Sequence, residues 1–119
     1  MPLEGLKGRR AVVTGAASGI GASVVERLRR EGVEVFATDI HPAAGVFAAD
    51  LTDVDDVEKV SGKAGTPDFL VNIAGGPVAP SREHTLPDLP KGSLKLEDVD
   101  EGEWSGVLAA NLTTAFLVC

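Results

Sequence analysis

A glycine-rich run at residues 13–21, VTGAASGIG, constrains this chain more than any other feature. It follows a short segment, residues 10–13, that has the pattern of a buried parallel strand, and it precedes apolar residues at helical spacing that continue until Gly32. In such a turn one glycine permits a tight backbone reversal, a second lets the main chain approach a ligand, and a third lets the helix pack closely on the strand. The helix N-terminus then offers N–H groups and a positive dipole end to an anion. We therefore predict a strand, a glycine turn and a helix that hold the phosphates of a dinucleotide.

Length and composition limit the class of protein. A chain of 119 residues with 44% hydrophobic content has room for one domain and one core, without a separate substrate domain. The net charge of -7 comes without a basic stripe, which argues against nucleic acid as a partner. No apolar run has the length of a signal peptide or a membrane span, so we expect a cytoplasmic protein that does not bind membranes. The single cysteine, Cys119, cannot form an intramolecular disulfide, and His41 and His84 lack metal-ligand spacing, so we expect no metal site.

A second strand is predicted at residues 33–38, and it ends at Asp39. In a nucleotide-binding β-α-β unit, a carboxylate about 20 residues beyond the glycines accepts hydrogen bonds from the adenosine ribose and repels a 2′-phosphate. Asp39 lies 18 residues after Gly21. It therefore favours NAD over NADP, and the alternative is an acid that only closes the strand.

Two further strands and a helix follow in the pattern. The connection at residues 40–45 is too short for an ordinary crossover helix, so a turn or a local irregularity must replace it. A third strand is predicted at 46–51, and an acid-rich helix with a capping residue begins at 52–60. A fourth strand at 68–76 has an apolar run that predicts burial on both faces, and it ends in a glycine pair.

The last third of the chain changes character. Residues 77–100 contain four prolines and little periodicity, which predicts a long inserted loop. Because the loop follows the carboxyl end of a parallel strand, it should overhang the ligand crevice, either as a substrate flap or as a disordered surface insertion. Residues 101–119 return to helical spacing and predict the start of a fourth helix with an apolar face. Asn111 lies within that face, where an amide must find hydrogen-bond partners.

These motifs together resemble the short-chain dehydrogenase/reductase family. The glycine run matches the signature TGxxxGIG, residues 72–75 (NIAG) stand where the family has NNAG, and Trp104 with Asn111 matches Trp-x6-Asn. The resemblance implies an α/β fold of the Rossmann type, a doubly wound parallel sheet. This chain would supply the first four strands, in the order 3-2-1-4 with flanking helices, and would be incomplete at its C-terminus. Residues 1–119 would then be a partial NAD-binding domain.

The resemblance also implies roles for individual residues. Asn111 would be the one member of the catalytic tetrad in this chain, where it helps hold the water that connects the active-site lysine to solvent. Ile73 replaces the second asparagine of the family motif, which puts one local hydrogen bond in doubt. Most relatives carry a full helix at 40–45, so this chain would belong to a subset with a shortened crossover. The implied cofactor contacts are Gly15, Ser18, Gly19, Ile20 and Gly21 around the pyrophosphate and nicotinamide side, Asp39 at the adenosine ribose, Asp50 and Leu51 at the adenine, and Asn72, Ala74 and Gly75 at the central ribose.

The chemistry of the family is hydride transfer between a nicotinamide and an alcohol or ketone. It uses a tyrosine as general acid or base, a lysine four residues later and a serine that positions the carbonyl. This chain contains no tyrosine. We therefore expect the cofactor-binding half of an NAD-dependent oxidoreductase, inactive by itself, and the alternative is a non-catalytic dinucleotide-binding or interaction module. The uncovered edge of the fourth strand and the apolar half-helix predict a homo-oligomer, a dimer or tetramer, or completion by a C-terminal half.

Overall fold

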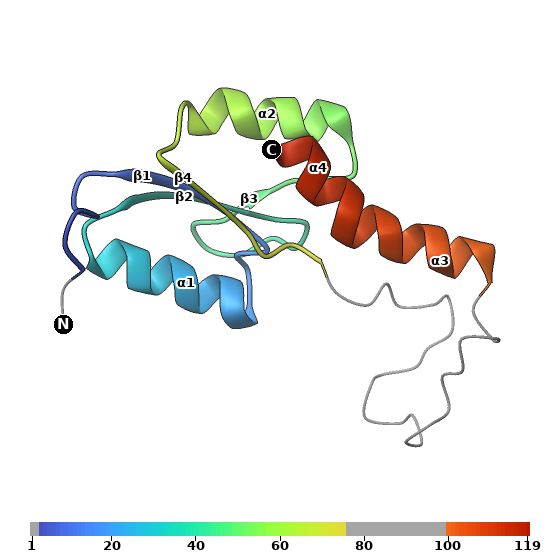
Figure 1. Ribbon diagram of the computed structural model, residues 1–119, viewed down its shortest axis with the longest axis horizontal. Helices are drawn as coiled ribbons and strands as arrows, with labels where there is room; N and C mark the ends of the chain where they lie inside the picture. Colours follow the sequence, from blue (N-terminus) through green and yellow to red (C-terminus); the bar gives the residue numbers. More distant parts are fainter. Residues whose placement is uncertain (1–2, 76–99) are drawn as a thin grey trace, which may run out of the picture.

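The computed structural model describes residues 3–75 and 100–119, and its centre is a parallel sheet (Figure 1). The four strands are β1 (Arg10–Thr14), β2 (Glu34–Asp39), β3 (Phe47–Ala48) and β4 (Phe69–Asn72). They lie in the spatial order β3-β2-β1-β4, and all three pairings are parallel. The predicted Rossmann-type sheet with the order 3-2-1-4 is therefore confirmed.

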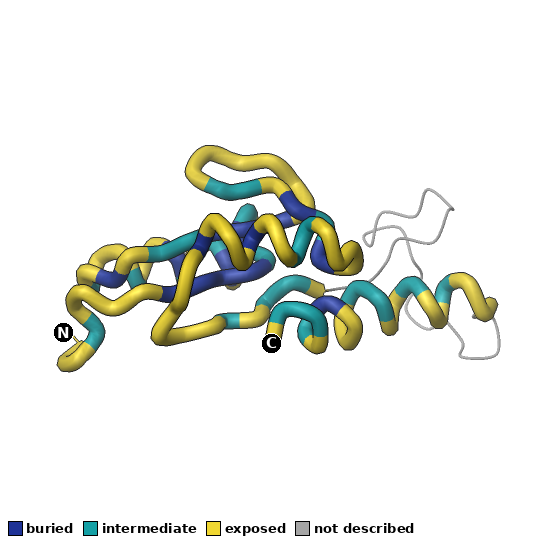
Figure 2. Tube along the Cα trace, turned by 90° about the horizontal axis from the view of Figure 1, so that it is seen from above, coloured by how far each residue is buried: buried dark blue, intermediate teal, exposed yellow. Residues whose placement is uncertain are grey.

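β1 is a central strand of this sheet and carries much of the core. Four of its five residues are buried, and Val13 pairs with Ala37 of β2 on one side and with Val71 of β4 on the other. Short and β-branched side chains suit a strand that is covered on both faces. The dark segments in the middle of Figure 2 mark this buried centre.

Helices cover both faces of the sheet, as Figure 1 shows, with α1 (Gly19–Arg30) on one face and α2 (Val54–Ala64) on the other. On the α1 side, Val25 packs with Val13 and Ala37. On the α2 side, Val60 packs with Leu51 and neighbouring apolar residues. Each helix therefore buries one apolar stripe against the sheet, although Val54 at the start of α2 is 53% exposed.

The connection between β2 and β3 is a turn, closed by an isolated bridge between Ala43 and Val46. The first alternative for this connection, a crossover helix reduced to a turn, is thus the one found. β3 itself spans two residues, which corrects the longer strand predicted at 46–51. The strand ends early because Asp50 begins the turn into α2, where its backbone oxygen accepts a hydrogen bond from the Asp53 N–H at 3.0 Å.

β4 is less buried than its apolar run predicts. Phe69 and Leu70 are 38% and 37% exposed, so the prediction of burial on both faces is wrong for these residues. The reason is that β4 pairs with β1 and with no other strand in the described part of the chain. The predicted loop at 77–100 lies outside the described residues except for Asp100.

The C-terminal helical segment is one continuous helix in Figure 1. It consists of α3 (Glu101–Leu108), the π-helical turn η3 (Ala109–Thr113) and α4 (Thr114–Val118). Its start is fixed by a capping box in which Asp100 and Glu103 each accept the other's backbone N–H. Its end packs on the α2 side of the sheet through Val118. Among the described residues, no helix is both long enough and apolar enough to cross a membrane.

Candidate cofactor-binding site

A cleft of about 480 Å³ opens where the carboxyl ends of the parallel strands meet. Open α/β sheets bind ligands at this edge. The cleft collects residues from five separate segments that the sequence singled out. They are the glycine loop, the end of β2, the link from β3 to α2, the turn after β4 and the C-terminal helical segment. The predicted cofactor contacts that line it are Gly15, Ser18, Ile20, Asp39, Asp50, Leu51, Ala74 and Gly75.

The glycine loop is packed against the turn after β4. Gly15 has a φ of 65°, and a Cβ built on it would lie 2.6 Å from the backbone nitrogen of Ala74. A Cβ on Gly21 would lie 1.8 Å from the Gly15 carbonyl oxygen. Gly21 is therefore the position where α1 packs on the glycine loop. Of the predicted glycine contacts in this loop, Gly19 and Gly21 do not line the cleft.

The N-terminus of α1 differs from that of the other two described helices that begin with a clear cap. Its N-cap residue, Ser18, makes no side-chain capping hydrogen bond, and the first turn contains no acid. By contrast, Asp53 caps α2 and Asp100 caps α3 through carboxylate oxygens. The first turn of α1 thus presents N–H groups and a positive dipole end beside a cleft that Ser18 and Ile20 line.

Asp39 ties the glycine loop to the end of β2. Its Oδ2 accepts the Ala17 N–H at 3.0 Å, its Oδ1 accepts the His41 N–H at 2.9 Å, and the residue is buried. Each oxygen of a carboxylate has two lone pairs, so both oxygens can accept a further hydrogen bond. The carboxylate is held in one position at the cleft and retains capacity for two hydroxyl groups.

Thr14 organises the turn after β4, a role that the sequence pattern did not predict. Its fully buried Oγ1 accepts the N–H groups of Ile73 and Ala74, both at 3.1 Å, and donates to Asn72 Oδ1 at 3.3 Å. The sequence signal was a hydroxyl at the end of an otherwise apolar strand. Such a group needs partners when it is buried.

Asn72 does not line the cleft, unlike its neighbours in the motif. Its side chain accepts from Thr14 on β1 and donates to Cys119 Sγ at 3.6 Å. It therefore connects β4 to β1 and to the end of the C-terminal helix. This placement suits a residue that steadies the sheet beside the site.

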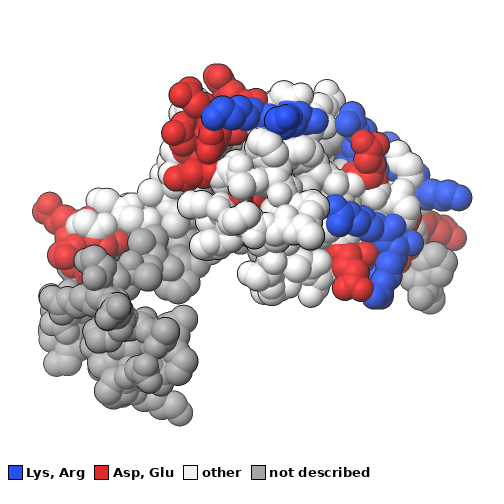
Figure 3. Space-filling view, turned by 180° about the vertical axis from the view of Figure 1, so that it is seen from behind, with Lys and Arg blue, Asp and Glu red and all other residues white. Residues whose placement is uncertain are grey.

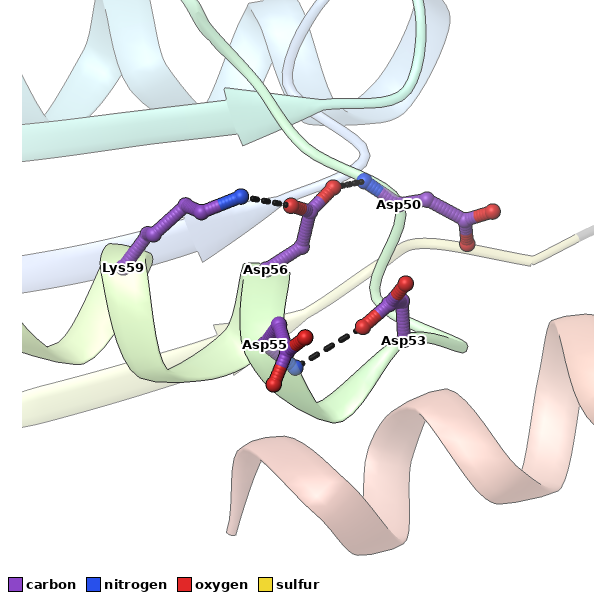
Figure 4. A network of polar contacts seen from close by, with 5 residues as sticks. All are labelled: Asp50, Asp53, Asp55, Asp56 and Lys59. Carbon is purple, nitrogen blue, oxygen red and sulfur yellow. Dashed lines mark hydrogen bonds and ion pairs between the residues drawn. The ribbon is translucent and has the colours of Figure 1, made fainter.

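A carboxylate on α2 holds the backbone that carries Asp50 and Leu51 (Figure 4). Asp56 accepts the Asp50 N–H at 2.9 Å and the Lys59 ammonium at 2.8 Å. The hydrogen bond from Lys59 lowers the pKa of Asp56, and the same bond raises the pKa of Lys59. Asp56 was not predicted as a site residue, because its contact with Asp50 depends on how α2 begins.

The Asp50 side chain points away from Asp56 in Figure 4 and bonds to Thr52 instead. Its Oδ1 accepts both the Thr52 N–H at 2.9 Å and the Thr52 hydroxyl at 2.6 Å. Figure 3 shows carboxylates gathered on the surface over the start of α2, where Asp53 and Asp55 lie.

Asn111 lies in η3 next to Gly75 but is not among the lining residues, whereas its neighbour Ala110 is. Its Nδ2 donates to the Val107 carbonyl at 2.9 Å. A Cβ built on Gly75 would lie 2.5 Å from the Asn111 Oδ1. The Asn111 amide can therefore approach the Gly75 backbone only because glycine has no side chain. π-helical turns often occur at functional sites. The close approach of Gly75 and Asn111 brings together two predicted site residues, one from the turn after β4 and one from η3.

The charged side chains that line the cleft are acidic. Its lining contains Asp39, Asp50 and His41, and no lysine or arginine among the described residues. The same described part of the chain contains no cluster of three potential metal ligands. Besides His41, the lining includes other residues that were not predicted as cofactor contacts: Ile40, Ala49, Thr52, Ile73, Ala110 and Thr114.

Comparison with protein families and curated sequences gives consistent matches. The model of the family described as short chain dehydrogenase matches residues 9–119. D-threitol dehydrogenase of Mycolicibacterium smegmatis is 31% identical over 96% of this chain and 46% of its own length. 2,3-Dihydro-2,3-dihydroxybenzoate dehydrogenase of Bacillus subtilis is 28% identical over 98% of this chain and 46% of its own length.

Solved structures show the same similarity. The ligand-free aldohexose dehydrogenase of Thermoplasma acidophilum superposes with a TM-score of 0.72 at 27% identity, over 95% of this chain and 42% of that one. A short chain dehydrogenase from Mycobacterium smegmatis gives a TM-score of 0.73 at 27% identity, over 95% of this chain and 49% of that one. The chain therefore spans about half the length of the relatives that it matches.

Proposed function

Because the chain belongs to the short-chain dehydrogenase family, whose members are NAD(P)-dependent oxidoreductases, we propose that its cleft binds NAD. We further propose that the chain forms the cofactor-binding half of an enzyme that transfers a hydride between the nicotinamide and an alcohol or ketone. The observation that carries the proposal is the convergence of the glycine loop, Asp39 and the turn after β4 on one cleft. These are the elements that a dinucleotide needs for its phosphates and for its two riboses.

The glycine loop fits the pyrophosphate. Gly15 leaves no side chain between the loop and the turn at Ala74, and Gly21 lets α1 approach the loop closely. The first turn of α1 has no acid that would repel phosphate and no side chain that caps its N–H groups. An anion in the cleft would receive hydrogen bonds from that turn, with Ser18 and Ile20 beside it. Gly19 belongs to the same turn, which its φ of 55° helps to form.

The other end of the cleft fits adenosine. Asp39 is held by two backbone N–H groups and can accept both ribose hydroxyls, while its charge opposes a 2′-phosphate. The buried Leu51 offers an apolar contact to the adenine, and Asp50 is fixed beside it by Thr52 and Asp56. NAD is therefore the proposed cofactor, in preference to NADP.

The central ribose and the nicotinamide fall beside the turn after β4. Ala74 and Gly75 line this part of the cleft, while Asn72 and Thr14 hold the turn from behind. When bound, the nicotinamide supplies the hydride acceptor or donor. Asn111, next to Gly75, takes by family resemblance the role of holding the water that links the active-site lysine to solvent.

Cofactor preference tests the proposal directly. We expect calorimetry on the intact protein to give tighter binding of NADH than of NADPH. Asp39→Asn should reduce that preference by about tenfold or more, because it removes the charge that opposes the 2′-phosphate. Asp55→Asn serves as the control, since Asp55 lies in the first turn of α2 and does not line the cleft. A preference for NADPH, or an intact protein that binds neither cofactor, would contradict the proposal.

A second candidate function rests on one observation, which is that the chain contains no tyrosine. A non-catalytic dinucleotide-binding or interaction module would need the cleft alone. Turnover of a ketone by the intact protein separates the two candidates. For an enzyme, Asn111→Ala should lower kcat on the order of tenfold or more with a smaller change in KM. A module would bind the cofactor and show no turnover in either form.

We also propose that the protein works as a homo-oligomer, or with a C-terminal half that covers the same surface. The support is the apolar face of the C-terminal helical segment, where Trp104, Leu112 and Phe116 are 56%, 64% and 78% exposed. Apolar surface of this kind is typical of an interface.

A further inference from the structure

A second groove lies on the α1 side of the sheet, apart from the cleft. It runs between α1 and the connection from β2 to β3, has a volume of about 520 Å³, and shares no lining residue with the cleft. The glycine loop separates the two, because Gly15 and Ser18 line the cleft whereas Ala16 and Ala17 line the groove. A volume of this size is within the range of small-molecule sites.

The groove exists because the connection between β2 and β3 is a turn. The chain steps from β1 to β2 to β3 in one direction across the sheet. Crossovers between parallel strands are right-handed, so this connection belongs on the same face as α1. A crossover helix would cover the sheet beside α1, and the turn at residues 40–46 leaves that space open. The groove lies at the β3 end of the sheet, so a strand added beside β4 would not close it.

The floor of the groove is apolar and continuous with the core. Five alanines and two valines line it. Ala16 and Val25 are buried members of the core cluster on the α1 side, and Val46 packs against the same cluster. These side chains are short and leave the groove unfilled. An aliphatic group that lies on them would remove its own surface and theirs from water, which favours binding.

One charge in the groove has no partner on the protein. The charged lining residues are Glu26, Arg29 and Arg30, all on α1. Glu26 and Arg30 form an ion pair, whereas the exposed Arg29 makes no ion pair or side-chain hydrogen bond within the described part of the chain. Its guanidinium lies over the connection, 4.0 Å from the Cβ position of Gly45. The lining therefore keeps one net positive charge at the edge of an apolar floor.

We propose that this groove binds a carboxylate that carries an aliphatic tail, at a site separate from the cleft. The tail lies on the alanines and valines, and the carboxylate accepts hydrogen bonds from the Arg29 guanidinium, whose fork matches a carboxylate. A single negative charge balances the one net positive charge of the lining. The proposal does not depend on the proposed function, because no residue of the groove lines the cleft.

Octanoate is the probe, used below the concentration at which it forms micelles. Calorimetry on the intact protein should show saturable binding of octanoate, about tenfold weaker binding of octanol, which lacks the charge, and no measurable binding of acetate, which lacks the tail. Arg29→Gln should weaken octanoate binding about tenfold and leave octanol binding unchanged. Arg27→Gln is the matched control, since it removes a positive charge from the same helix and does not alter the lining.

A second pair of variants tests the apolar floor. Ala44→Leu places a larger side chain at an exposed position in the groove. It should weaken the binding of octanoate and octanol alike by about fivefold, the effect of losing contact for about one methylene group. Ala48→Leu, at an exposed position of β3 that does not line the groove, should change neither affinity. Because both alanines are exposed, neither variant disturbs the core.

Three results would overturn the proposal. The first is equal affinity for octanoate and octanol, or equal octanoate affinities of Arg29→Gln and Arg27→Gln. The second is octanoate binding that survives Ala44→Leu and is lost in Leu112→Glu with Phe116→Glu, because the ligand would then lie on the apolar face of the C-terminal helical segment. The third is no octanoate binding together with weaker self-association of Arg29→Gln in light scattering, which would show that the groove receives a second copy of the chain.

Discussion

At the residue scale, Gly21 of α1 and Gly62 of α2 both lie within helices but have opposite surroundings. A Cβ on Gly21 of α1 would lie 1.8 Å from the Gly15 carbonyl oxygen, whereas one on Gly62 of α2 would meet nothing within 4 Å. We expect Gly21→Ala to destabilise the fold by about 3 kcal/mol, because backbone atoms must move to admit the methyl group. Gly62→Ala should stabilise it by about 1 kcal/mol through helix propensity. Urea denaturation of both variants measures the contrast.

Cofactor binding extends this comparison of the two glycines. Gly21→Ala should also weaken NADH binding, because the displaced glycine loop lines the cleft through Gly15 and Ser18. Gly62→Ala should leave NADH affinity unchanged. Equal stability of the two variants would show that α1 does not pack on the loop as described.

Thr14 provides a second residue-scale prediction. Thr14→Val replaces the buried hydroxyl by a methyl group and leaves the N–H groups of Ile73 and Ala74 without their acceptor. We expect a loss of about 2–4 kcal/mol in the free energy of unfolding, since each unsatisfied buried donor costs about 1–3 kcal/mol. Thr14→Ser keeps the hydroxyl and should lose about 1 kcal/mol, the contribution of one buried methyl group. A Val variant as stable as the Ser variant would contradict the role given to the hydroxyl.

The predictability of single residues depended on whether their role is local. Gly15 and Asp39 were found from the sequence because a tight turn and a strand end fix their position within a short segment. Thr14 and Asp56 were missed as site residues because their contacts depend on packing between segments. For Thr14 the partners lie 58 to 60 residues away, a distance that no short pattern reports.

At the scale of elements, Asp68 fixes the start of β4 against β1. Its Oδ2 accepts the Arg10 N–H at 2.9 Å, and its Oδ1 accepts from the Arg9 guanidinium at 3.2 Å. The Arg10 backbone N–H is the main cause that lowers the pKa of Asp68 below its ordinary value of 3.8. The sheet pairing between β1 and β4 is therefore linked to the ionisation of this exposed carboxyl group.

The pH dependence of stability follows from the direction of that shift. A carboxyl group with a lowered pKa in the folded state stabilises the fold above its ordinary pKa, and this contribution disappears as the pH falls through the lower value. We expect the Tm of the wild type to fall as the pH drops below about 4, and that of Asp68→Asn to fall less steeply. Thermal unfolding between pH 2 and pH 6 tests this, and parallel curves for the two proteins would exclude a contribution from Asp68.

The accuracy of the predicted elements varied for a physical reason. β1, β2 and α1 were predicted closely because each has one dominant period and a clear stop at a glycine or an acid. The burial of β4 was overestimated, since an apolar run such as residues 69–71 shows what a strand can bury and not whether a neighbour covers it. β3 was predicted too long because Ala49 and Leu51 are buried although they lie outside the ladder.

At the scale of the whole molecule, the apolar face of the C-terminal helical segment should govern association. We expect the chain to self-associate at micromolar concentration, because Trp104, Leu112 and Phe116 are more than half exposed and β4 pairs with β1 alone among the described strands. Leu112→Glu with Phe116→Glu should reduce association, since charge opposes burial of that face. Light scattering over a dilution series measures the change.

A matched surface variant controls for net charge. Leu3→Glu with Val54→Glu also adds two acids, at apolar residues that are 51% and 53% exposed elsewhere on the surface, and should leave association unchanged. A wild-type chain that stays a folded monomer at all concentrations, without a partner, would contradict the prediction of association.

The turn between β2 and β3 has a consequence for the order of folding. Parallel strands usually pair only after a crossover of a dozen or more residues has been ordered. Here the Thr38 hydroxyl donates to the Phe47 carbonyl across nine residues, whereas the bonds from Arg10 to Asp68 that align β1 with β4 span 58. The entropy lost on closing a loop grows with its length, so the short connection brings β2 and β3 together at lower cost. We therefore expect the end of the cleft at Asp39 to form before the end at Gly75, with the sheet growing from β3 towards β4.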